Sequence, residues 1–351
     1  MKVAIDSGPL TSGHSIRGVG FYTRQLGGAL KKEKSVEVDV VDFAKADLSH
    51  YDIVHYPAFH PYFLTLPFNK PTKTVVTIHD LIPLIYPKQY PAGLRGKLKF
   101  LIQKLLVSRV DAVITVSETS KKDIVRLLGI PPEKVDVTYE AAGEIFQPIK
   151  DEKALTKIKN KYDLPSKFIL YVGDVNYNKN VAGLADACKL LGVPLVIVGK
   201  QAKIEGFDRS HPENRAFVKL LEKYGNDPEI IRVGFVPDED LVAIFNLASV
   251  YCQPSFYEGF GLPVLQAMAC GIPVVCAKTQ ALVEIAKAAS LFADPKDPKD
   301  ISEKIKQVLT DNELRSQLVE TGKLLVKNYS WEKTAKATVD VYRKVMAGAK
   351  C

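Results

Sequence analysis

Short apolar runs, many of them β-branched, recur along the first 140 or so residues and are separated by stretches with a helical period of apolar positions. Several runs are apolar on both faces, which is typical of parallel strands covered by helices on both sides. The predicted strands are Val3–Asp6, Val36–Val41, Ile53–Tyr56, Thr74–Ile78, Ala112–Val116 and Val135–Thr138. The predicted helices are Phe21–Lys31, Leu94–Ser108 and Thr119–Leu128.

The second half of the chain repeats this alternation, and further helices are expected after Asp300. The predicted strands are Phe168–Val172, Leu195–Val198, Ile230–Val233, Val250–Gln253, Pro273–Cys276 and Ser290–Phe292. The predicted helices are Val181–Leu190, Glu213–Tyr224, Glu239–Leu247, Leu262–Cys270 and Leu282–Ala288.

A polar, lysine-rich stretch from about Gln147 to Lys167 separates the two halves, and a chain of 351 residues favours two domains. We expect one domain over residues 1–155, a second over 156–330, and a helix within 331–351 that crosses back to the first. The predicted fold class is α/β, with two Rossmann-like, doubly wound parallel sheets facing a cleft. Ligands of such sheets bind beyond the carboxyl ends of the strands.

Composition is ordinary for a globular enzyme, with 46% hydrophobic and 25% charged residues. No run of 18 apolar residues is present, so we expect no transmembrane helix. A strand is predicted from Val3, so we expect no signal peptide and therefore a cytoplasmic protein. The five cysteines form no CxxC pair, and Cys252, Cys270 and Cys276 are expected to be small core residues. The net charge of +8 favours phosphate or anionic lipid as partners, and no nucleic-acid motif is found.

The most informative segment runs from Pro254 to Val275, with the sequence PSFYEGFGLPVLQAMACGIPVV. Pro263 suits the first turn of the predicted helix, and Gly259 and Gly261 let the backbone approach a ligand closely. Amides at the positive end of the helix dipole would then bind an anion. The amides concerned are those of Phe260, Gly261 and Leu262. From the glycines alone, a tight turn without a ligand remains an alternative.

This segment resembles the signature PSxxEGFGLPxLEAMAxGxPVV of the retaining family-4 glycosyltransferases (glycosyl transferases group 1). Other stretches resemble family landmarks in the family's order, so the resemblance covers nearly the whole chain. They are Val75–Leu81, Val116–Ser120, Tyr171–Gly173, Lys179–Asn180, Gly234–Pro237 and Ser330–Lys333. The resemblance implies the GT-B fold and retaining transfer of a hexosyl group from a nucleotide-diphosphate sugar to a glycan or lipid-linked hydroxyl. It is strongest to the mannosyltransferase-like branch, which favours GDP-mannose over UDP-glucose.

The resemblance also implies roles for single residues. Glu258 would contact hydroxyls of the transferred sugar, His79 would contact a sugar hydroxyl near the reacting carbon, and Lys179 would hold the diphosphate and stabilise the leaving phosphate. The donor-binding residues would be Gly18, Gly20, Gly173, Asn178, Lys179, Gly259, Phe260, Gly261, Leu262 and Gln266. The remaining histidines, expected as surface or loop residues, are His14, His50, His55, His60 and His211.

Three positions depart from the family pattern. Gln266 stands where the family has a second Glu, Asp174 where many members have Arg, and Asn178 where Arg is common. A neutral hydrogen bond in place of a charged one costs roughly 1–2 kcal/mol, or about tenfold in donor binding. A protein with a degraded donor site, acting as a non-catalytic partner or scaffold, is therefore an alternative. Another GT-B enzyme, such as a nucleotide-sugar epimerase, is disfavoured by the Glu258–Met268 stretch.

No cluster of His, Cys and carboxylates has metal-ligand spacing, so we expect no metal or other cofactor, with the nucleotide sugar as co-substrate. A retaining glycosidase would need two carboxylates about 5 Å apart, and no such pair is identifiable. The resemblance implies instead that the departing phosphate helps to deprotonate the acceptor on the same face of the sugar.

One predicted helix has an unusual charge pattern. The segment Leu94–Leu106 carries apolar residues at 94, 98, 101 and 105 and lysines on the other side. It is either an ordinary helix packed on the sheet or a basic amphipathic surface that contacts anionic lipid. The second interpretation would place the protein at the inner face of the cytoplasmic membrane.

Overall fold

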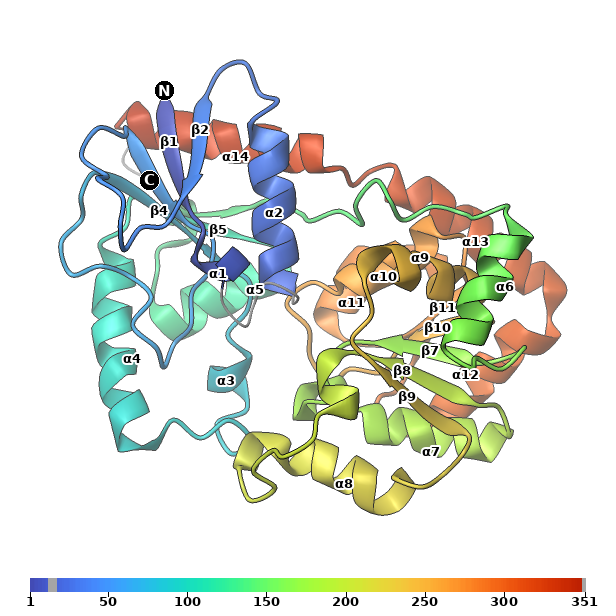
Figure 1. Cartoon of the computed structure of the whole chain (residues 1–351). Coiled ribbons are helices and arrows are strands. Elements are labelled where there is room, and N and C mark those ends of the chain that lie inside the picture. Colours follow the sequence, from blue (N-terminus) through green and yellow to red (C-terminus); the bar gives the residue numbers. More distant parts are fainter. Residues whose placement is uncertain (12–17, 349–351) are drawn as a thin grey trace. The chain divides into compact units, whose positions relative to one another are not determined.

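The computed structural model describes residues 1–11 and 18–348 and divides into two compact units. Unit 1 comprises Met1–Ala141 and Tyr329–Cys351, and unit 2 comprises Ala142–Asn328. Each unit contains a six-stranded sheet, and all described strand pairings in both sheets are parallel (Figure 1). Parallel pairing requires crossover connections. Helices provide most of them, whereas the β2–β3 and β3–β4 connections of unit 1 contain no helix.

Unit 1 has the strand order β2-β1-β3-β4-β5-β6. Its strands are β1 (Lys2–Asp6), β2 (Glu37–Val41), β3 (Ile53–Tyr56), β4 (Lys73–Ile78), β5 (Ala112–Thr115) and β6 (Val135–Val137). Its helices are α1 (Gly8–Thr11), α2 (Gly18–Leu30), α3 (Ile82–Ile85), α4 (Gly93–Ser108), α5 (Glu118–Asp123), the π-helix η1 (Ile124–Leu128), the 3-10 turn η2 (Pro132–Lys134) and α14 (Trp331–Met346).

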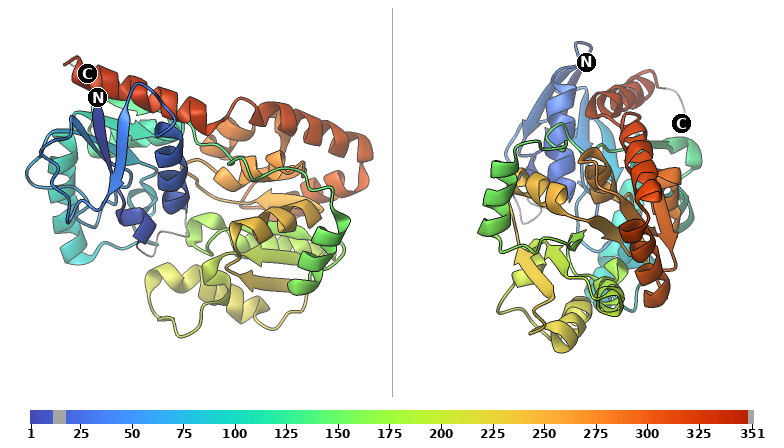
Figure 2. Two further views of the ribbon diagram at one scale, coloured as in Figure 1. Left: turned by 45° about the horizontal axis from the view of Figure 1, so that its top comes forward. Right: turned by 90° about the vertical axis from the view of Figure 1, so that its right-hand side faces the viewer.

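The two faces of the unit 1 sheet bury different side chains. Val54, Val76 and Val113 face a core that also contains Leu106 of α4 and Ile124 of η1. Side chains alternate along a strand, so the intervening residues of β3 and β4 point to the opposite face. Helices α2 and α14 lie side by side along this second face, and α14 also contacts β4 and β5 (Figures 1 and 2). Helix α14, from the end of the chain, therefore completes the first unit.

Unit 2 has the strand order β12-β11-β10-β7-β8-β9. Its strands are β7 (Ile169–Val172), β8 (Leu195–Val198), β9 (Ile230–Gly234), β10 (Val250–Gln253), β11 (Val274–Ala277) and β12 (Ser290–Ala293). Its α-helices are α6 (Glu152–Lys161), α7 (Val181–Leu191), α8 (Arg215–Tyr224), α9 (Asp238–Leu247), α10 (Leu262–Ala269), α11 (Gln280–Ala286), α12 (Pro298–Thr310) and α13 (Asn312–Val326). Its 3-10 turns are η3 (Tyr177–Lys179), η4 (Lys200–Lys203), η5 (Pro212–Asn214) and η6 (Lys287–Ala289). Residues of α7, α8 and α12 share one core with β7, β8 and β10.

The predicted strands of both halves are all present, and the predicted helices agree except at their ends. The cysteines Cys188, Cys252, Cys270 and Cys276 are free and buried, which confirms the prediction for the last three, whereas Cys351 lies outside the described residues. Among residues 1–11 and 18–348, no helix combines the length and apolar character needed to span a bilayer.

Two segments differ from the prediction. The stretch expected to be an irregular linker contains α6, which Asp151 caps by accepting from the amides of Lys153 and Ala154 at 2.9 and 3.1 Å. Helix α6 packs on α9 within unit 2, and it spans the boundary expected at residues 155/156. The helix expected over 119–128 is α-helical only to Asp123 and continues as the π-helix η1 until Gly129, whose φ of 74° ends it.

Candidate active site

The connection from β10 to α10 carries the most informative sequence segment. Strand β10 is buried along its whole length, and α10 begins at Leu262. Gly261 adopts φ 105° at the N-cap, and a Cβ there would lie 2.6 Å from Leu282 Cδ2. No described side chain caps α10, and Phe260 is buried just ahead of it. The first amides of α10 therefore donate no hydrogen bond to a capping side chain, and an N-terminus of this kind attracts anions.

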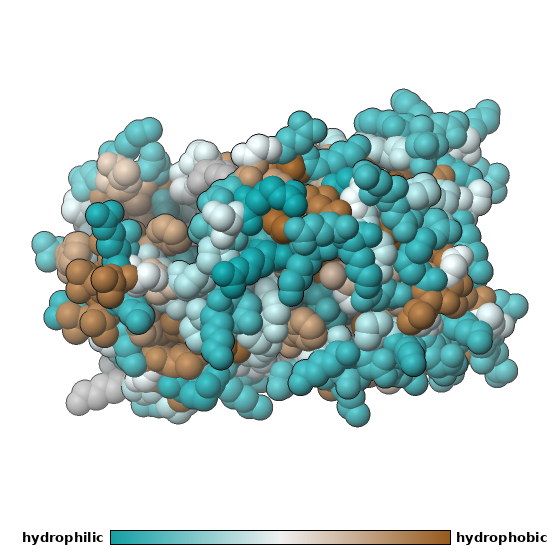
Figure 3. All heavy atoms as spheres, turned by 90° about the horizontal axis from the view of Figure 1, so that it is seen from below, coloured by the Kyte–Doolittle hydropathy of each residue, from teal (hydrophilic) through white to brown (hydrophobic). Residues whose placement is uncertain are grey.

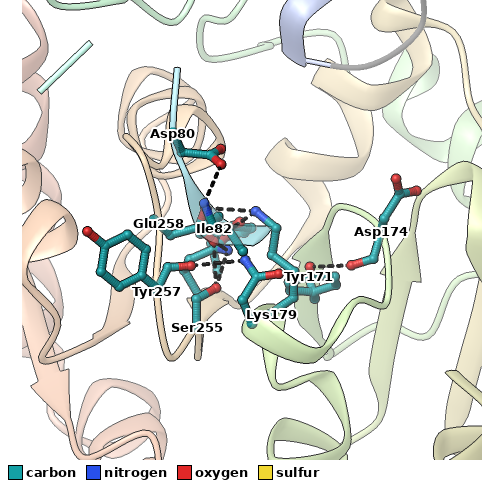
Figure 4. A network of polar contacts seen from close by, with 11 residues as sticks. Asp80, Ile82, Tyr171, Asp174, Lys179, Ser255, Tyr257 and Glu258 are labelled. Atoms are coloured by element: carbon teal, nitrogen blue, oxygen red, sulfur yellow. Dashed lines mark hydrogen bonds and ion pairs between the residues drawn. The ribbon is translucent and has the colours of Figure 1, made fainter. Parts of the chain in front are cut away.

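Glu258 lies in this loop with only 5% of its surface exposed. Its Oε1 accepts hydrogen bonds from Ser255 Oγ at 2.6 Å and from Gln253 Nε2 at 2.7 Å (Figure 4). Lys179 Nζ lies 2.9 Å from Oε1 and 2.7 Å from Oε2. Such charge-assisted bonds compensate a buried carboxylate for the water it has lost. The site therefore contains a buried carboxylate paired with an ammonium group.

Lys179 is the last residue of η3, and the residues beside it fix its position. Asn180 adopts the left-handed φ of 54°, and its Nδ2 donates to the carbonyls of Pro254 at 3.1 Å and Pro295 at 2.6 Å. The buried Asn178 donates from Nδ2 to the carbonyl of Tyr257 at 3.0 Å. Together these contacts connect η3 to the loop that carries Glu258. In this structure the predicted donor residue Asn178 holds that loop through a hydrogen bond to backbone.

Gly173 follows β7 with a φ of 147° that few other residues adopt, and a Cβ there would lie 2.8 Å from the Tyr171 hydroxyl. Gly199 follows β8, and a Cβ there would lie 2.2 Å from the Gly173 carbonyl oxygen. Tyr171 donates to the carbonyl of Asp174 at 2.8 Å. The carboxyl ends of these neighbouring strands are thus packed so closely that only glycine fits at two positions.

Gln266 is the fifth residue of α10 and is buried, with 5% of its surface exposed. Gly173, Asn178, Lys179, Glu258 and Gln266 all belong to unit 2, as do Gly259–Leu262. Gln253 and Ser255 join them as partners of Glu258 that received no role in the sequence analysis. Gln253 could have been identified from the sequence because it is a polar residue at the carboxyl end of an otherwise apolar, buried strand.

The other predicted residues belong to unit 1. Gly18 and Gly20 lie in the first turn of α2, the former exposed and the latter buried, while Arg17 and His14 lie outside the described residues. His79 follows β4, and its side chain is 16% exposed. Its Nδ1 lies 3.2 Å from Glu140 Oε1 and its Nε2 lies 3.1 Å from the carbonyl oxygen of Pro57.

The pKa of His79 reflects two opposing effects. Burial lowers it, but the hydrogen bond and the charge of Glu140, the Pro57 carbonyl and the charge of Asp80 raise it by more. The pKa of His79 is therefore above the ordinary value of 6.5.

His55 corrects one expectation, because it is a fully buried residue of β3 and not a surface or loop residue. Its Nδ1 lies 2.6 Å from the Tyr342 hydroxyl of α14, and its Nε2 lies 2.8 Å from Thr77 Oγ1. Burial lowers the pKa of His55 to about 3, with a smaller contribution from the charge of His79. The apolar strand offered no sign that α14 would supply a hydroxyl for this ring.

Within residues 1–11 and 18–348, no group of three or more His, Cys, Asp and Glu side chains is arranged to hold a metal ion. In the loop region around Glu258, the ammonium group of Lys179 and the amides at the start of α10 are suited to meet an anionic ligand. Together with the carboxylate of Glu258, they can bind an anion and a polar, hydroxyl-bearing group side by side.

Comparisons with known proteins agree with this chemistry. Residues 152–325 match the model of glycosyl transferases group 1, and residues 43–141 match that of glycosyltransferase family 4. The chain is 32% identical over 310 residues to O-antigen chain mannosyltransferase B of Escherichia coli, covering 86% of this chain and 76% of that protein. It is 30% identical over 319 residues to the serotype-specific mannosyltransferase WbdA of Escherichia coli, covering 88% of this chain but only 38% of that protein.

Among solved structures, sucrose-phosphate synthase from Thermosynechococcus elongatus superposes with a TM-score of 0.77 at 20% identity, covering 99% of this chain and 100% of that one. This likeness shows the fold, which is GT-B, with two doubly wound α/β units. The matches to both family models and to a relative above 30% identity show that this chain belongs to the glycosyl transferases group 1, with a family-4 N-terminal domain, and transfers sugar from a nucleotide sugar.

Proposed function

We propose that the chain transfers a hexosyl group, with retention of anomeric configuration, from GDP-mannose in preference to UDP-glucose to a hydroxyl of a glycan or lipid-linked acceptor. The observation that carries this proposal is the cluster in which Lys179, Ser255 and Gln253 converge on the Glu258 carboxylate beside the start of α10. The printed names of the two Escherichia coli relatives, both mannosyltransferases, support mannose as the sugar.

The chemistry of the cluster suits this role. Lys179 has three N–H donors on a flexible stem and can bind a diphosphate while the sugar–phosphate bond breaks. Glu258 can accept hydrogen bonds from sugar hydroxyls through the lone pairs its partners leave available. Both of its oxygens lie within 3 Å of Lys179 Nζ, which weakens it as a nucleophile. This favours a same-face reaction assisted by the departing phosphate over double displacement through a glycosyl–enzyme intermediate.

A panel of nucleotide sugars tests the donor. We expect GDP-mannose at 100 times its dissociation constant to stabilise the protein by about 2.7 kcal/mol, measured as a rise in melting temperature, and to exceed UDP-glucose and dTDP-glucose at equal concentration. An acceptor mixture with the best donor should then yield a product whose one-bond coupling between the anomeric carbon and its proton shows the donor's configuration. An inverted product would refute retention, and stabilisation only by UDP-sugars would refute the donor assignment.

The same assay tests two further parts of the proposal. Lys179 can supply the positive charge that a divalent ion supplies in other transferases, so EDTA should leave the rate unchanged. The alternative of a non-catalytic partner, based on Gln266, Asp174 and Asn178, predicts no turnover of the donor. Transfer or donor hydrolysis by the purified chain would exclude that alternative.

We further propose that α4 touches an anionic membrane surface, which would bring the enzyme to a lipid-linked acceptor at the cytoplasmic face. The leucine stripe of this helix, defined as Leu94, Leu98, Leu101 and Leu105, points outward with exposures of 87%, 62%, 64% and 53%. Its buried positions are instead Gly96, Gln103, Leu106 and Val107. An apolar helix face in water is an unfavourable arrangement that lipid contact would relieve.

The surroundings of the leucine stripe match an anionic surface. Helix α4 carries Arg95, Lys97, Lys99 and Lys104 and no acidic residue. The connection between β3 and β4 adds Phe63 and Phe68, which are 59% and 64% exposed, and Lys99 Nζ of α4 lies 5.5 Å from the centroid of the Phe63 ring. Figure 3 shows hydrophobic residues gathered at the left of the molecule, the side on which α4 lies in Figure 1. Each basic residue near an anionic bilayer contributes about 1 kcal/mol of attraction at moderate salt.

Co-sedimentation with vesicles tests this part. We expect binding to phosphatidylglycerol vesicles, weaker binding to phosphatidylcholine vesicles, and loss of binding in the double variant Leu98→Glu/Leu101→Glu. The matched control Leu190→Glu/Leu324→Glu alters two leucines of unit 2 with 61% and 63% exposure and should bind normally. Equal loss in both variants, or no binding by the unaltered protein at low salt, would refute the membrane contact.

A further inference from the structure

The ring of His79 lies between two acceptors of different origin. Glu140, which follows β6, faces Nδ1 at 3.2 Å, and the Pro57 carbonyl, which follows β3, faces Nε2 at 3.1 Å. The Tyr22 ring completes the surroundings in an edge-to-face arrangement with the His79 ring, with ring centroids 4.6 Å apart. Each of these groups comes from a different element of unit 1, so the ring is held from several directions.

This geometry specifies the protonation state of His79. A neutral imidazole has one N–H donor and one lone pair, so it can satisfy only one of two acceptors. Two acceptors are both satisfied only when both nitrogens carry a proton, which is the imidazolium form. The other arrangement, a neutral ring bonded to a protonated carboxylic acid, would place the proton on the group that is ordinarily the weaker base.

The charged and titratable groups around the ring agree with a cation. The carboxylates of Glu140 and Asp80 favour the charged form, and burial opposes it. His55, on the neighbouring strand β3, is held neutral by burial and adds no competing charge near neutral pH. Burial also raises the pKa of Tyr22, so its phenol keeps its proton. The net direction is a raised pKa for His79.

The segment that carries Glu140 is itself fixed. The amide of Thr138 donates to the Thr115 carbonyl at 2.8 Å, which extends the pairing of β6 with β5. The carbonyl of Tyr139 accepts from Thr334 Oγ1 of α14 at 2.6 Å. Glu140 is buried, with 5% of its surface exposed. The carboxylate is therefore presented to His79 by backbone that is anchored on both the sheet and the C-terminal helix.

We propose that Glu140 is a positioning residue that holds His79 as an imidazolium, so that His79 offers the substrate a fixed positive charge and not a base. A doubly protonated ring has no lone pair with which to take a proton from an acceptor hydroxyl. With 16% of its side chain exposed, the cation instead suits a phosphate oxygen or the negative charge that grows on a leaving phosphate. The substrate part of this inference rests on the proposed transferase function, whereas the protonation state does not.

Nitrogen-15 NMR of the histidine rings tests the protonation state without any assay of activity. The His79 signals, assigned by their loss in His79→Gln, should show both nitrogens protonated at pH 7 and a titration midpoint above 6.5. Glu140→Gln should lower the midpoint, Glu140→Asp should restore part of it, and Glu133→Gln, at an exposed carboxylate before β6, should leave it unchanged. A singly protonated ring at pH 7, or a midpoint that Glu140→Gln does not move, would overturn the proposal.

Kinetics with the best donor test the consequence for the substrate. Activity that depends on the cation should fall as pH rises through the His79 midpoint, and Glu140→Gln should move that fall to lower pH. If Glu140→Gln lowers the His79 midpoint by one pH unit, the fraction of His79 in the imidazolium form falls by up to about tenfold at pH values above the midpoint. At those pH values kcat should therefore drop by up to about tenfold, while KM for the acceptor changes little. A rate that rises with pH through the midpoint would instead identify His79 as a base. If no transfer is detected at all, the NMR result still decides the role of Glu140.

Discussion

Two acid–base pairs with buried carboxylates, Lys179–Glu258 in unit 2 and His79–Glu140 in unit 1, hold their charges in different ways. In unit 2 the anion is the fixed partner, because Ser255 and Gln253 also donate to Glu258, while Lys179 is an ammonium on a flexible chain. In unit 1 the cation is the fixed partner, because both ring nitrogens of His79 face acceptors. Lys179 can exchange one oxygen ligand for another, whereas His79 loses a buried hydrogen bond if it turns away.

This difference suggests that the two cations, Lys179 and His79, serve different purposes. A lysine with three donors suits a diphosphate that must bind and then leave, whereas a locked imidazolium suits a charge that must stay in one place during the reaction. The following predictions are ordered from the largest expected effect to the smallest.

The strongest test separates the two members of the unit 2 pair. Glu258→Gln and Lys179→Met should each lower kcat/KM by about 10²–10³-fold, because each removes one charge from a low-dielectric site. The double variant should lose much less than the product of the two, since the residues act as a unit. Glu303→Gln and Lys306→Met, at exposed positions of α12, serve as controls. Strictly multiplicative losses in steady-state kinetics would show that the pair does not function together.

Unit 1 should be the more acid-sensitive unit because of His55. Its pKa is lowered to about 3 in the folded protein, so below pH 6.5 the unfolded chain takes up a proton that the folded chain resists. Stability is therefore lost as pH falls from about 6.5 towards 3, at about 1.4 kcal/mol per pH unit from this group. Thermal melts from pH 7 to 4.5 should show a smaller decline for His55→Gln, and an unaltered decline for His211→Gln at an exposed site. Equal slopes for His55→Gln and the unaltered protein would refute this contribution.

A glycine pair compares the unit 2 loop with an ordinary helix. Gly261→Ala forces a Cβ to 2.6 Å from Leu282 Cδ2 at a φ of 105° and should cost about 1–3 kcal/mol of stability. Gly28→Ala, at an exposed helical position with open space around it, should stabilise by about 0.5–1 kcal/mol. Denaturant unfolding measures both, and an unchanged midpoint for Gly261→Ala would show that the loop tolerates rearrangement.

The smallest expected effect concerns Gln266, the buried amide of α10. Gln266→Glu restores the second carboxylate of the family pattern and should tighten donor binding by up to about tenfold, or 1–2 kcal/mol, with little change in kcat. Calorimetric titration with the nucleotide diphosphate measures this. Weaker binding would indicate that the neutral amide is matched to this donor.

The loop that carries Glu258 was visible in the sequence because it is local, whereas Lys179 reaches it from 79 residues away. Thirteen positions separate Gln253 from Gln266, and within them lie the glycines, Glu258 and the start of α10. The period of two in strands and of 3.6 in helices also predicted every strand of both sheets. Helix α6 was missed because its buried side is narrow: none of its residues is fully buried, and its lysines resemble those of a linker.

The sequence by itself determined the alternation of strands and helices, the glycine turn before α10 and the family. Only the tertiary structure decided which partner each titratable group received. Glu140 lies 61 residues from His79, and Tyr342 lies 287 residues from His55, so no local period could pair them. The tertiary structure also decided that the leucine stripe of α4 faces outward, because a helical period shows which residues share a face but not which face is buried.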